Sequence, residues 1–199
     1  NIMPLGANKA AIMGVAGVST ADVVLLASTT ASADANIAFT SVLTSAYKEY
    51  IFGFIDIHPA SDSQNFTFNG SDDTSSHSYD ITKTTSNFES DQAENTGTPK
   101  VVYSASLDLA QGTGYQPLYP GTDNDSDSCF SGYLHIFNPA STTYVTHFYA
   151  DTHGVHANYT AKRSFTAGYF NTTAAITAVD FKFGSGDIDS GKIKVWGVK

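Results

Sequence analysis

The hydrophobic pattern along most of this chain repeats every second residue, which is the period of a β-strand rather than of a helix. Short stretches of alternating or continuous apolar residues are separated by turn-forming residues. Proline stands where two of the stretches end, in His58-Pro59 and Asn138-Pro139, and a missing N–H does little harm there. The pattern predicts strands at residues 35–42, 50–57, 66–68, 78–83, 101–107, 133–137, 144–150, 163–170, 176–183 and 192–198.

The stretch 50–57, YIFGFIDI, is almost wholly apolar rather than alternating. A continuous run of this length is typical of a strand that is buried on both faces. It therefore predicts a central strand.

Many short strands with turn chemistry between them predict an all-β fold, an antiparallel, jelly-roll-like β-sandwich of about 8–10 strands. A short echo between residues 54–60 (FIDIHPA) and 134–140 (LHIFNPA) agrees with a doubled sandwich, although it is too short to establish a repeat. We expect the sandwich to occupy residues 33–199. Residues 1–32 are apolar and rich in small side chains, and we expect them to form an extended arm that docks on a neighbouring subunit.

The last strand is preceded by GDIDSGK at residues 186–192, which has the spacing of a phosphate-binding loop. Such a loop needs a helix after it, and Ser or Thr after its Lys to hold magnesium. Here Ile193 follows Lys192 and the sequence continues as a strand. The segment therefore predicts a β-hairpin between residues 176–183 and 192–198, with Trp196 at least partly buried.

Composition narrows the possible partners. The net charge is −9, so the chain has no electrostatic footprint for nucleic acid phosphates. The apolar run at residues 10–18 is too short to span a membrane. Cys129 is the one cysteine, which excludes an intrachain disulfide. We expect neither a nucleic acid nor a membrane partner.

Long polar loops carry the candidate binding groups, because loops on a rigid sheet scaffold often bind ligands. Asp123, Asp125 and Asp127 match the start of a calcium-binding EF-hand loop, but Ser128 and Leu134 replace its Gly and Glu. This segment is either a solvated acidic loop or an irregular calcium site, and calcium is the one cofactor that the sequence leaves open. Tyr115 and Tyr119 lie on the same loop and are candidates for stacking on sugar rings.

Signatures of catalysis are absent. The sequence contains no Gly-x-Ser-x-Gly elbow and no His-Glu-x-x-His zinc motif. His153 and His156 are expected on a loop, where His147 could approach them, but a zinc site needs further ligands. We expect no catalytic residue and no enzymatic activity.

Three segments resemble a family of small virion proteins from tailed, especially marine, bacteriophages. These are residues 38–60 (AFTSVLTSAYKEYIFGFIDIHPA), 131–150 (SGYLHIFNPASTTYVTHFYA) and 167–199 (AGYFNTTAAITAVDFKFGSGDIDSGKIKVWGVK). The resemblance covers about residues 36–199, and its most specific part is the C-terminal hairpin Phe-x-Phe-x-Ser-Gly-x-Ile-x-Ser-Gly-x-Ile-x-x-x-Gly-Val. It implies a non-enzymatic β-sandwich that is built into the virion.

The sequence thus predicts a bacteriophage virion structural protein, either a capsid decoration or a neck, tail or fibre component. Its partners would be other virion proteins and copies of itself, and its location the virion. The alternative is a glycan-binding module for host adhesion, which calcium could assist. A glycoside hydrolase is a third hypothesis, and it requires two apposed carboxylates in a cleft.

Overall fold

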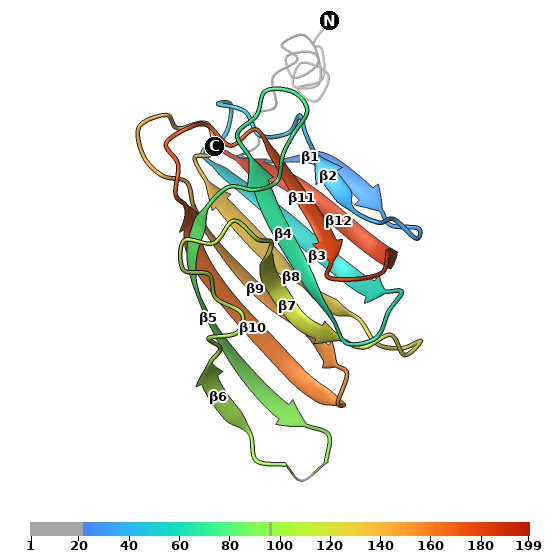
Figure 1. Ribbon diagram of the computed structural model, residues 1–199. Coiled ribbons are helices and arrows are strands. Elements are labelled where there is room, and N and C mark those ends of the chain that lie inside the picture. The colour runs from blue at the N-terminus through green and yellow to red at the C-terminus, as the bar shows by residue number, and fades with distance from the viewer. Residues whose placement is uncertain (1–21, 96) are drawn as a thin grey trace, which may run out of the picture.

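The computed structural model describes residues 22–95 and 97–199, and within them the fold is all-β and antiparallel, as predicted. Figure 1 shows the strands in chain order. They are β1 (Val23–Thr30), β2 (Ile37–Phe39), β3 (Glu49–Pro59), β4 (Gln64–Ser71), β5 (Lys83–Ala93), β6 (Lys100–Tyr103), β7 (Gln116–Thr122), β8 (Phe130–Phe137), β9 (His147–His156), β10 (Thr160–Phe170), β11 (Ala178–Phe183) and β12 (Ile188–Val198).

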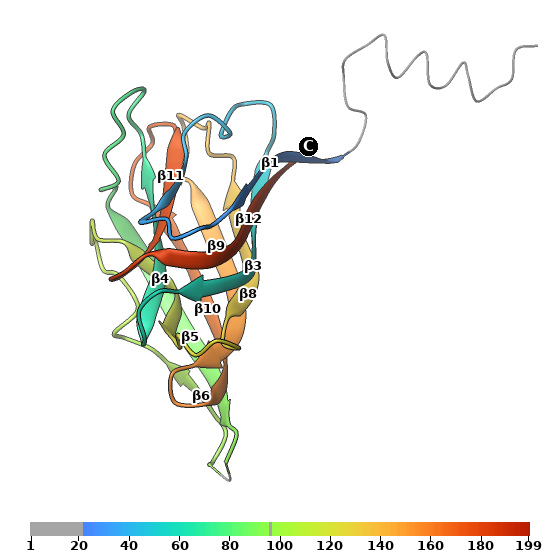
Figure 2. The same ribbon diagram turned by 90° about the vertical axis from the view of Figure 1, so that its right-hand side faces the viewer.

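The strands form two facing layers of unequal size, as in a jelly-roll-like sandwich (Figure 2). The large sheet has the order β1-β12-β3-β8-β9-β10-β5-β6, and the small sheet has the order β7-β4-β11-β2. One pairing, Thr122 with His156, joins β7 to β9 and connects the layers into a nearly closed sheet. The large sheet therefore extends well beyond the small one.

Phenylalanine rings fill the space between the layers. Phe52 and Phe54 project inward from β3, Phe66 and Phe68 from β4, and Phe181 from β11, and each is at most 1% exposed. Their ring centroids lie 5.3–6.3 Å apart in tilted, edge-to-face and stacked pairs. Because large aromatic rings bury much apolar area, this cluster is the main stabilising element of the fold.

The continuous apolar run of β3 does not signify burial on both faces, so that prediction is wrong. Burial alternates along most of the strand: Tyr50, Phe52 and Phe54 are inside, whereas Ile51 is half-buried and Ile55 is exposed. The large sheet is covered on its inner face only. The outward residues of β3 lie beside Tyr133 and Trp196, so they form part of an apolar outer surface.

The predicted C-terminal hairpin is also wrong. β11 pairs with β4 and β2 in the small sheet, whereas β12 pairs with β3 and β1 in the large sheet. Residues 184–187 therefore cross between the layers. Gly191 has a φ of 115°, which glycine adopts without strain, and Lys192 lies inside β12, so no helix begins there. Trp196 is half-buried, as predicted.

Several strand predictions need correction. β1, β5 and β7 were not predicted as strands, and residues 78–82 form no strand although Lys83 begins β5. Ser, Thr, Asn and Gln dominate β5, so its inward side chains are polar and give no hydrophobic alternation. β7 holds Pro117 and Pro120, which usually argue against a strand.

The predicted N-terminal arm divides into two parts. Residues 1–21 lie outside the described residues. β1 pairs with β12 of the same chain, and the N–H groups of Ala31 and Asp34 donate to Gly191 and Ile188 oxygens at 3.0 and 3.1 Å. Residues 22–32 thus extend the sheet of the domain, and docking of the arm on a neighbour stays a prediction.

Candidate functional site

Aromatic and imidazole rings gather on the outer side of the large sheet. We call this surface the outer aromatic face, and it comprises Tyr133, His135, Phe137, His147, Tyr149, Tyr169 and Trp196. In β8 and β9 these residues alternate with buried ones such as Leu134, Ile136 and Phe148, so the strand period itself presents them outward. Tyr133 is 53% exposed and Tyr149 is 42% exposed.

The rings of the outer aromatic face stack on one another. The centroids of His135 and Tyr149 lie 4.5 Å apart with an interplanar angle of 9°, and those of Phe137 and Tyr149 lie 5.8 Å apart at 29°. Stacked rings turn faces toward each other and leave edges for solvent or a binding partner. His135 Nδ1 also lies 2.6 Å from Glu49 Oε1, which fixes the imidazole.

Trp196 and Tyr133 meet above Gly53. A Cβ on Gly53 would lie 2.7 Å from Trp196 Cζ3 and 3.3 Å from Tyr133 Cε1, so only glycine leaves room for both rings. This packing keeps Trp196 half-buried at the β12 side of the face.

A shallow hollow of about 710 Å³ adjoins the outer aromatic face on the side of β10. Its walls are Phe54, Ile55, Ser131, Gly132, Tyr133, Asp151, His153 and Arg163. Arg163 donates from Nε and Nη2 to the two Asp151 oxygens at 2.8 and 2.5 Å. This bidentate pair places donors and acceptors beside the Tyr133 ring, which is a combination that can hold a polar organic ligand.

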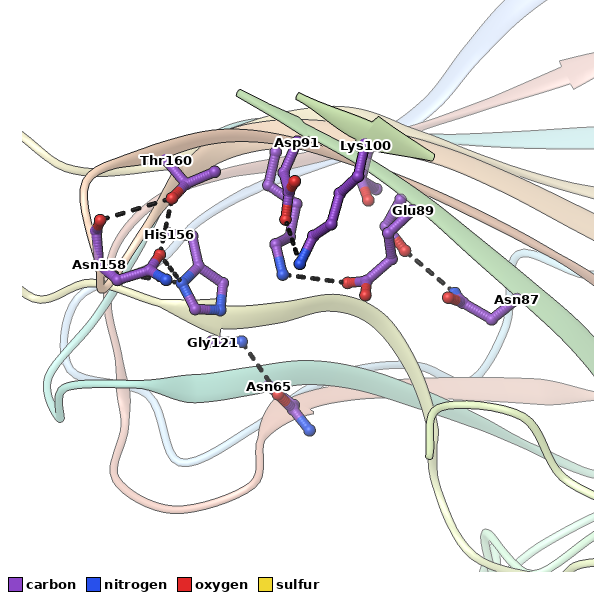
Figure 3. A network of polar contacts seen from close by, with 12 residues as sticks. Asn65, Asn87, Glu89, Asp91, Lys100, Gly121, His156, Asn158 and Thr160 are labelled. Atoms are coloured by element: carbon purple, nitrogen blue, oxygen red, sulfur yellow. Dashed lines mark hydrogen bonds and ion pairs between the residues drawn. The ribbon is translucent and has the colours of Figure 1, made fainter. Parts of the chain in front are cut away.

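A second concentration of polar groups lies on the inner side of the large sheet, where β7 approaches β9 and β10, and it runs from buried residues out to the exposed Lys100 and Asn158. We call it the inner polar cluster: Asn87, Glu89, Asp91, Lys100, His156, Asn158, Thr160, Lys162, Ser164 and Thr166 (Figure 3). Lys162 Nζ lies 3.4 Å from Glu89 Oε1, and Lys100 Nζ lies 3.4 Å from Asp91 Oδ2. Each carboxylate thus has a cationic partner. Lys162 and Glu89 are largely shielded from water, whereas the side chain of Lys100 is mostly exposed.

Hydrogen bonds extend the inner polar cluster along the strands. Asn87 Nδ2 donates to Ser164 Oγ at 3.0 Å and to Thr166 Oγ1 at 2.8 Å. Glycine at position 121, with a φ of 57°, lets His156 approach, because a Cβ there would lie 2.4 Å from His156 Nε2. Desolvation by burial, followed by the nearby Lys162 charge, lowers the pKa of His156.

Some buried polar atoms at this end of the sandwich have no hydrogen-bond partner in the part of the chain that the structure describes. They include Asn87 Oδ1, Glu89 Oε1, Tyr119 Oη and Thr122 Oγ1. Glu89 Oε1 is close enough to Lys162 for an ion pair but lacks hydrogen-bond geometry. The carboxylates of Glu89 and Asp91 nevertheless each form an ion pair with the lysine beside them.

A buried lysine begins β5. Lys83 is fully buried and donates to Asn69 Oδ1 at 2.6 Å and to the Ile81 oxygen at 2.8 Å. Burial without a contacting carboxylate lowers the pKa of Lys83 to about 8. Its role is structural, since it ties the 69–83 segment to β4.

The calcium candidates do not converge. Asp123 is buried and accepts from the Asp125 N–H at 3.2 Å, whereas Asp125 and Asp127 are exposed. In residues 22–95 and 97–199, no three His, Cys, Asp or Glu side chains form a group that could hold a metal ion. The loop instead caps itself through hydrogen bonds such as Ser128 N to Asp125 O at 2.8 Å.

The glycan candidates Tyr115 and Tyr119 are not surface platforms. Tyr119 is fully buried and stacks on Phe130 with centroids 4.9 Å apart, so its proposed contact with sugar is wrong. Tyr115 is half-buried; its hydroxyl donates to Asp180 at 2.8 Å, and Lys182 lies 4.1 Å from its ring centroid. Burial, followed by the Asp180 hydrogen bond, raises the pKa of Tyr115.

The proposed histidine pair is not a pair. His153 and His156 lie on strand β9 rather than on a loop, and residues three apart on a strand point to opposite faces. His153 borders the hollow outside, whereas His156 belongs to the inner polar cluster. His147 lies on the outer side, near Tyr169.

Sequence reasoning missed the outer aromatic face, although a signal was present. Tyr133, His135 and Phe137 alternate with apolar residues that fill the core, so both faces of β8 carry rings or aliphatic groups. A strand of this kind beside the equally apolar β3 indicates either burial on both sides or an exposed apolar surface, and the structure shows the exposed surface.

Comparisons with protein-family models, with curated proteins and with solved structures find no match for this chain. Within the described part of the chain, no helix is long and apolar enough to cross a membrane. The function must therefore be argued from the site itself.

Proposed function

We propose that the protein is a non-enzymatic structural component of a bacteriophage virion and that it binds neighbouring virion proteins through the outer aromatic face. The observation that carries this proposal is the gathering of exposed, mutually stacked rings on one sheet face of an otherwise acidic and polar chain. Exposed clusters of aromatic residues are typical of protein interfaces, whose centres are rich in Tyr, Trp and Phe. The family resemblance of residues 36–199 supports a place in the virion.

The stacking favours a protein partner over a flat ligand. His135 and Tyr149 cover each other's faces, so the surface offers ring edges, and beside them lies an open groove whose walls include Phe137, His147 and Tyr169. Side chains of a neighbouring protein fit such grooves, and aromatic anchors in them dominate interface energies. Asp151 is held by Arg163 and Glu89 by Lys162, so both carboxylates have a cationic partner within the chain.

The test is incorporation into particles. A variant with Tyr133→Ser, Phe137→Ser and Tyr149→Ser removes rings from the outer aromatic face. Its matched control is Tyr144→Ser with Tyr159→Ser, because these tyrosines are exposed but lie outside the face. We expect purified particles to lose the first variant and to keep the control. Equal incorporation of both folded variants would show that the outer aromatic face is not an assembly surface.

The N-terminal segment is the second expected assembly element. Val23 and Leu25 of β1 are exposed at an edge of the large sheet, and β1 leads back to residues 1–21. Deletion of residues 1–21 is a sharper test than deletion of residues 1–32, because it keeps β1 on β12. Undiminished incorporation after this deletion would contradict a docking role for the segment.

Glycan binding is a second candidate, favoured by the hollow beside Tyr133. One ring, the Asp151–Arg163 pair and His153 form a mixed wall that could receive a sugar. A glycan array with and without chelator tests this candidate, with Tyr133→Ala and Asp151→Asn as loss-of-binding variants. Glycan binding that both variants abolish would support a role in adhesion. Glycan binding that the chelator abolishes would show that calcium is required for it.

A further inference from the structure

We propose that strand β6 is a self-association site, at which two copies of the chain pair antiparallel and join their large sheets into one. β6 lies at the end of the large sheet, opposite to β1, and among the described residues it pairs only with β5 (Figure 1). The proposal concerns a different surface from the outer aromatic face, so it stands independently of the virion function.

The side chains of β6 are unusually apolar for an exposed edge. Val101 is 72% exposed and Tyr103 is 59% exposed, and all residues of the strand are exposed. Edge strands are normally protected from pairing by charges, prolines or bulges. In β6 the one charge is Lys100, whose Nζ lies 3.4 Å from Asp91 of the neighbouring strand. Within its four residues β6 thus has neither a proline nor a bulge, and its one lysine pairs with the neighbouring strand β5.

The hydrogen-bond pattern with β5 shows which backbone groups are open. Ser104 N donates to Asn87 O at 2.9 Å, and Val102 pairs with Glu89. Hydrogen-bonding residues alternate along an antiparallel strand, so residues 100, 102 and 104 turn their N–H and C=O groups toward β5. The groups of Val101 and Tyr103 consequently point to the free edge.

This arrangement is self-complementary. When two β6 strands meet antiparallel about a twofold axis at Val102, Val101 of each copy stands opposite Tyr103 of the other. Both residues have their donor and acceptor turned outward, so they can exchange hydrogen bonds reciprocally, as an isologous interface requires. In this register the exposed apolar side chains of the two copies also meet each other, and for this reason we assign the site to a second copy.

The side chains agree with the same register. Val101 and Tyr103 share the outer side of the sheet, where Phe88 stacks on Phe165 with centroids 4.8 Å apart and the Arg163 guanidinium lies 4.4 Å from the Phe165 ring centroid. Pairing would place Val101 of one copy beside Tyr103 of the other and extend this apolar strip across the junction. Lys100 would stand opposite Ser104, so no like charges face each other.

Cysteine cross-linking tests the register. Val102 would meet itself in a non-hydrogen-bonded pair, with Cα atoms about 4.5 Å apart, a separation that a disulfide can bridge. In a Cys129→Ser background, we expect Val102→Cys to form a covalent dimer under mild oxidation. The matched control Val101→Cys would not meet its own copy and should cross-link far less. Equal cross-linking of the two variants, or none with Val102→Cys, would overturn the register.

Sedimentation of the unmodified chain over a wide concentration range tests the association itself. We expect a reversible dimer that weakens at least tenfold with Val101→Pro, which removes an outward N–H but no bond to β5. Val23→Lys, at the other sheet edge, serves as the control and should leave association unchanged. A chain that stays monomeric throughout, or a dimer indifferent to Val101→Pro, would overturn the proposal. Circular dichroism verifies that each variant is folded.

Discussion

The outer aromatic face and the inner polar cluster reverse the usual distribution of side chains. The first places rings where water reaches them, and the second places the Lys162–Glu89 pair where water largely does not. Both lie on the same large sheet, on opposite sides, and both depart from what folding stability alone would select. The comparison separates polar groups that form ion pairs and hydrogen bonds within the fold from rings that we propose to bind a partner. Substitutions separate these two roles. Those in the inner polar cluster should change the free energy of unfolding strongly, and those on the outer aromatic face should change it little.

Removal of one inner cation should have the largest effect. Lys162→Met leaves the carboxylate of Glu89 buried without its cation, and the side chains of both residues are only about a tenth exposed. We expect the free energy of unfolding to fall by about 3–5 kcal/mol, measured by urea titration. The matched control is Lys100→Met, which breaks a pair whose lysine is mostly exposed and should cost about 1 kcal/mol or less.

The double variant Lys162→Met with Glu89→Leu sharpens this result. It removes both charges, so it should be less destabilising than Lys162→Met alone. If the double variant has the lower free energy of unfolding of the two, the Lys162–Glu89 pair contributes net stability, and a hydrophobic pair would not replace it without loss.

The next effect concerns pH and Lys83. Burial lowers the pKa of Lys83 to about 8 in the folded chain, from the ordinary value of 10.5. Between these values the unfolded chain binds more protons, so stability should rise as pH increases from about 8 to 10.5, by at most about 3 kcal/mol. Urea titrations across this range should show the rise, and Lys83→Met should abolish it. An unchanged slope in the variant would assign the dependence to other groups.

A smaller effect is expected at the boundary between the two regions, where Trp196 covers Gly53. Gly53→Ala places a methyl group 2.7 Å from Trp196 Cζ3, so the indole must move outward. We expect a loss on the order of 1 kcal/mol and a red-shifted emission of the single tryptophan. Gly114→Ala is the control, because a Cβ there meets nothing within 4 Å. Unchanged emission in Gly53→Ala would contradict the packing of Trp196 on β3.

The sequence predicted the β-sandwich because hydrophobic alternation and turn residues are local signals. It could not predict which strands pair: β11 and β12 follow each other, yet they lie in different layers. The site was harder still. Tyr119 and Tyr133 look equally suited to bind a ligand, and only the long-range pairing of β4 with β7 and of β3 with β8 buries one and exposes the other. β5 was not predicted because its inward residues are polar and give no hydrophobic alternation. These same residues form part of the inner polar cluster.

The smallest change in stability should follow substitution of the outer rings, and this result would complete the comparison. Tyr133→Ser and Tyr149→Ser remove rings that are about half exposed, so each should alter the free energy of unfolding by about 1 kcal/mol or less. For Tyr149→Ser, the loss of the stacked contact with His135 accounts for most of the decrease. Urea titration measures it, and binding to particles is measured on the same samples. Loss of binding with stability retained would assign the rings to an interface. A loss of several kcal/mol would instead make the rings a second, outward core, and incorporation defects of these variants would then report unfolding.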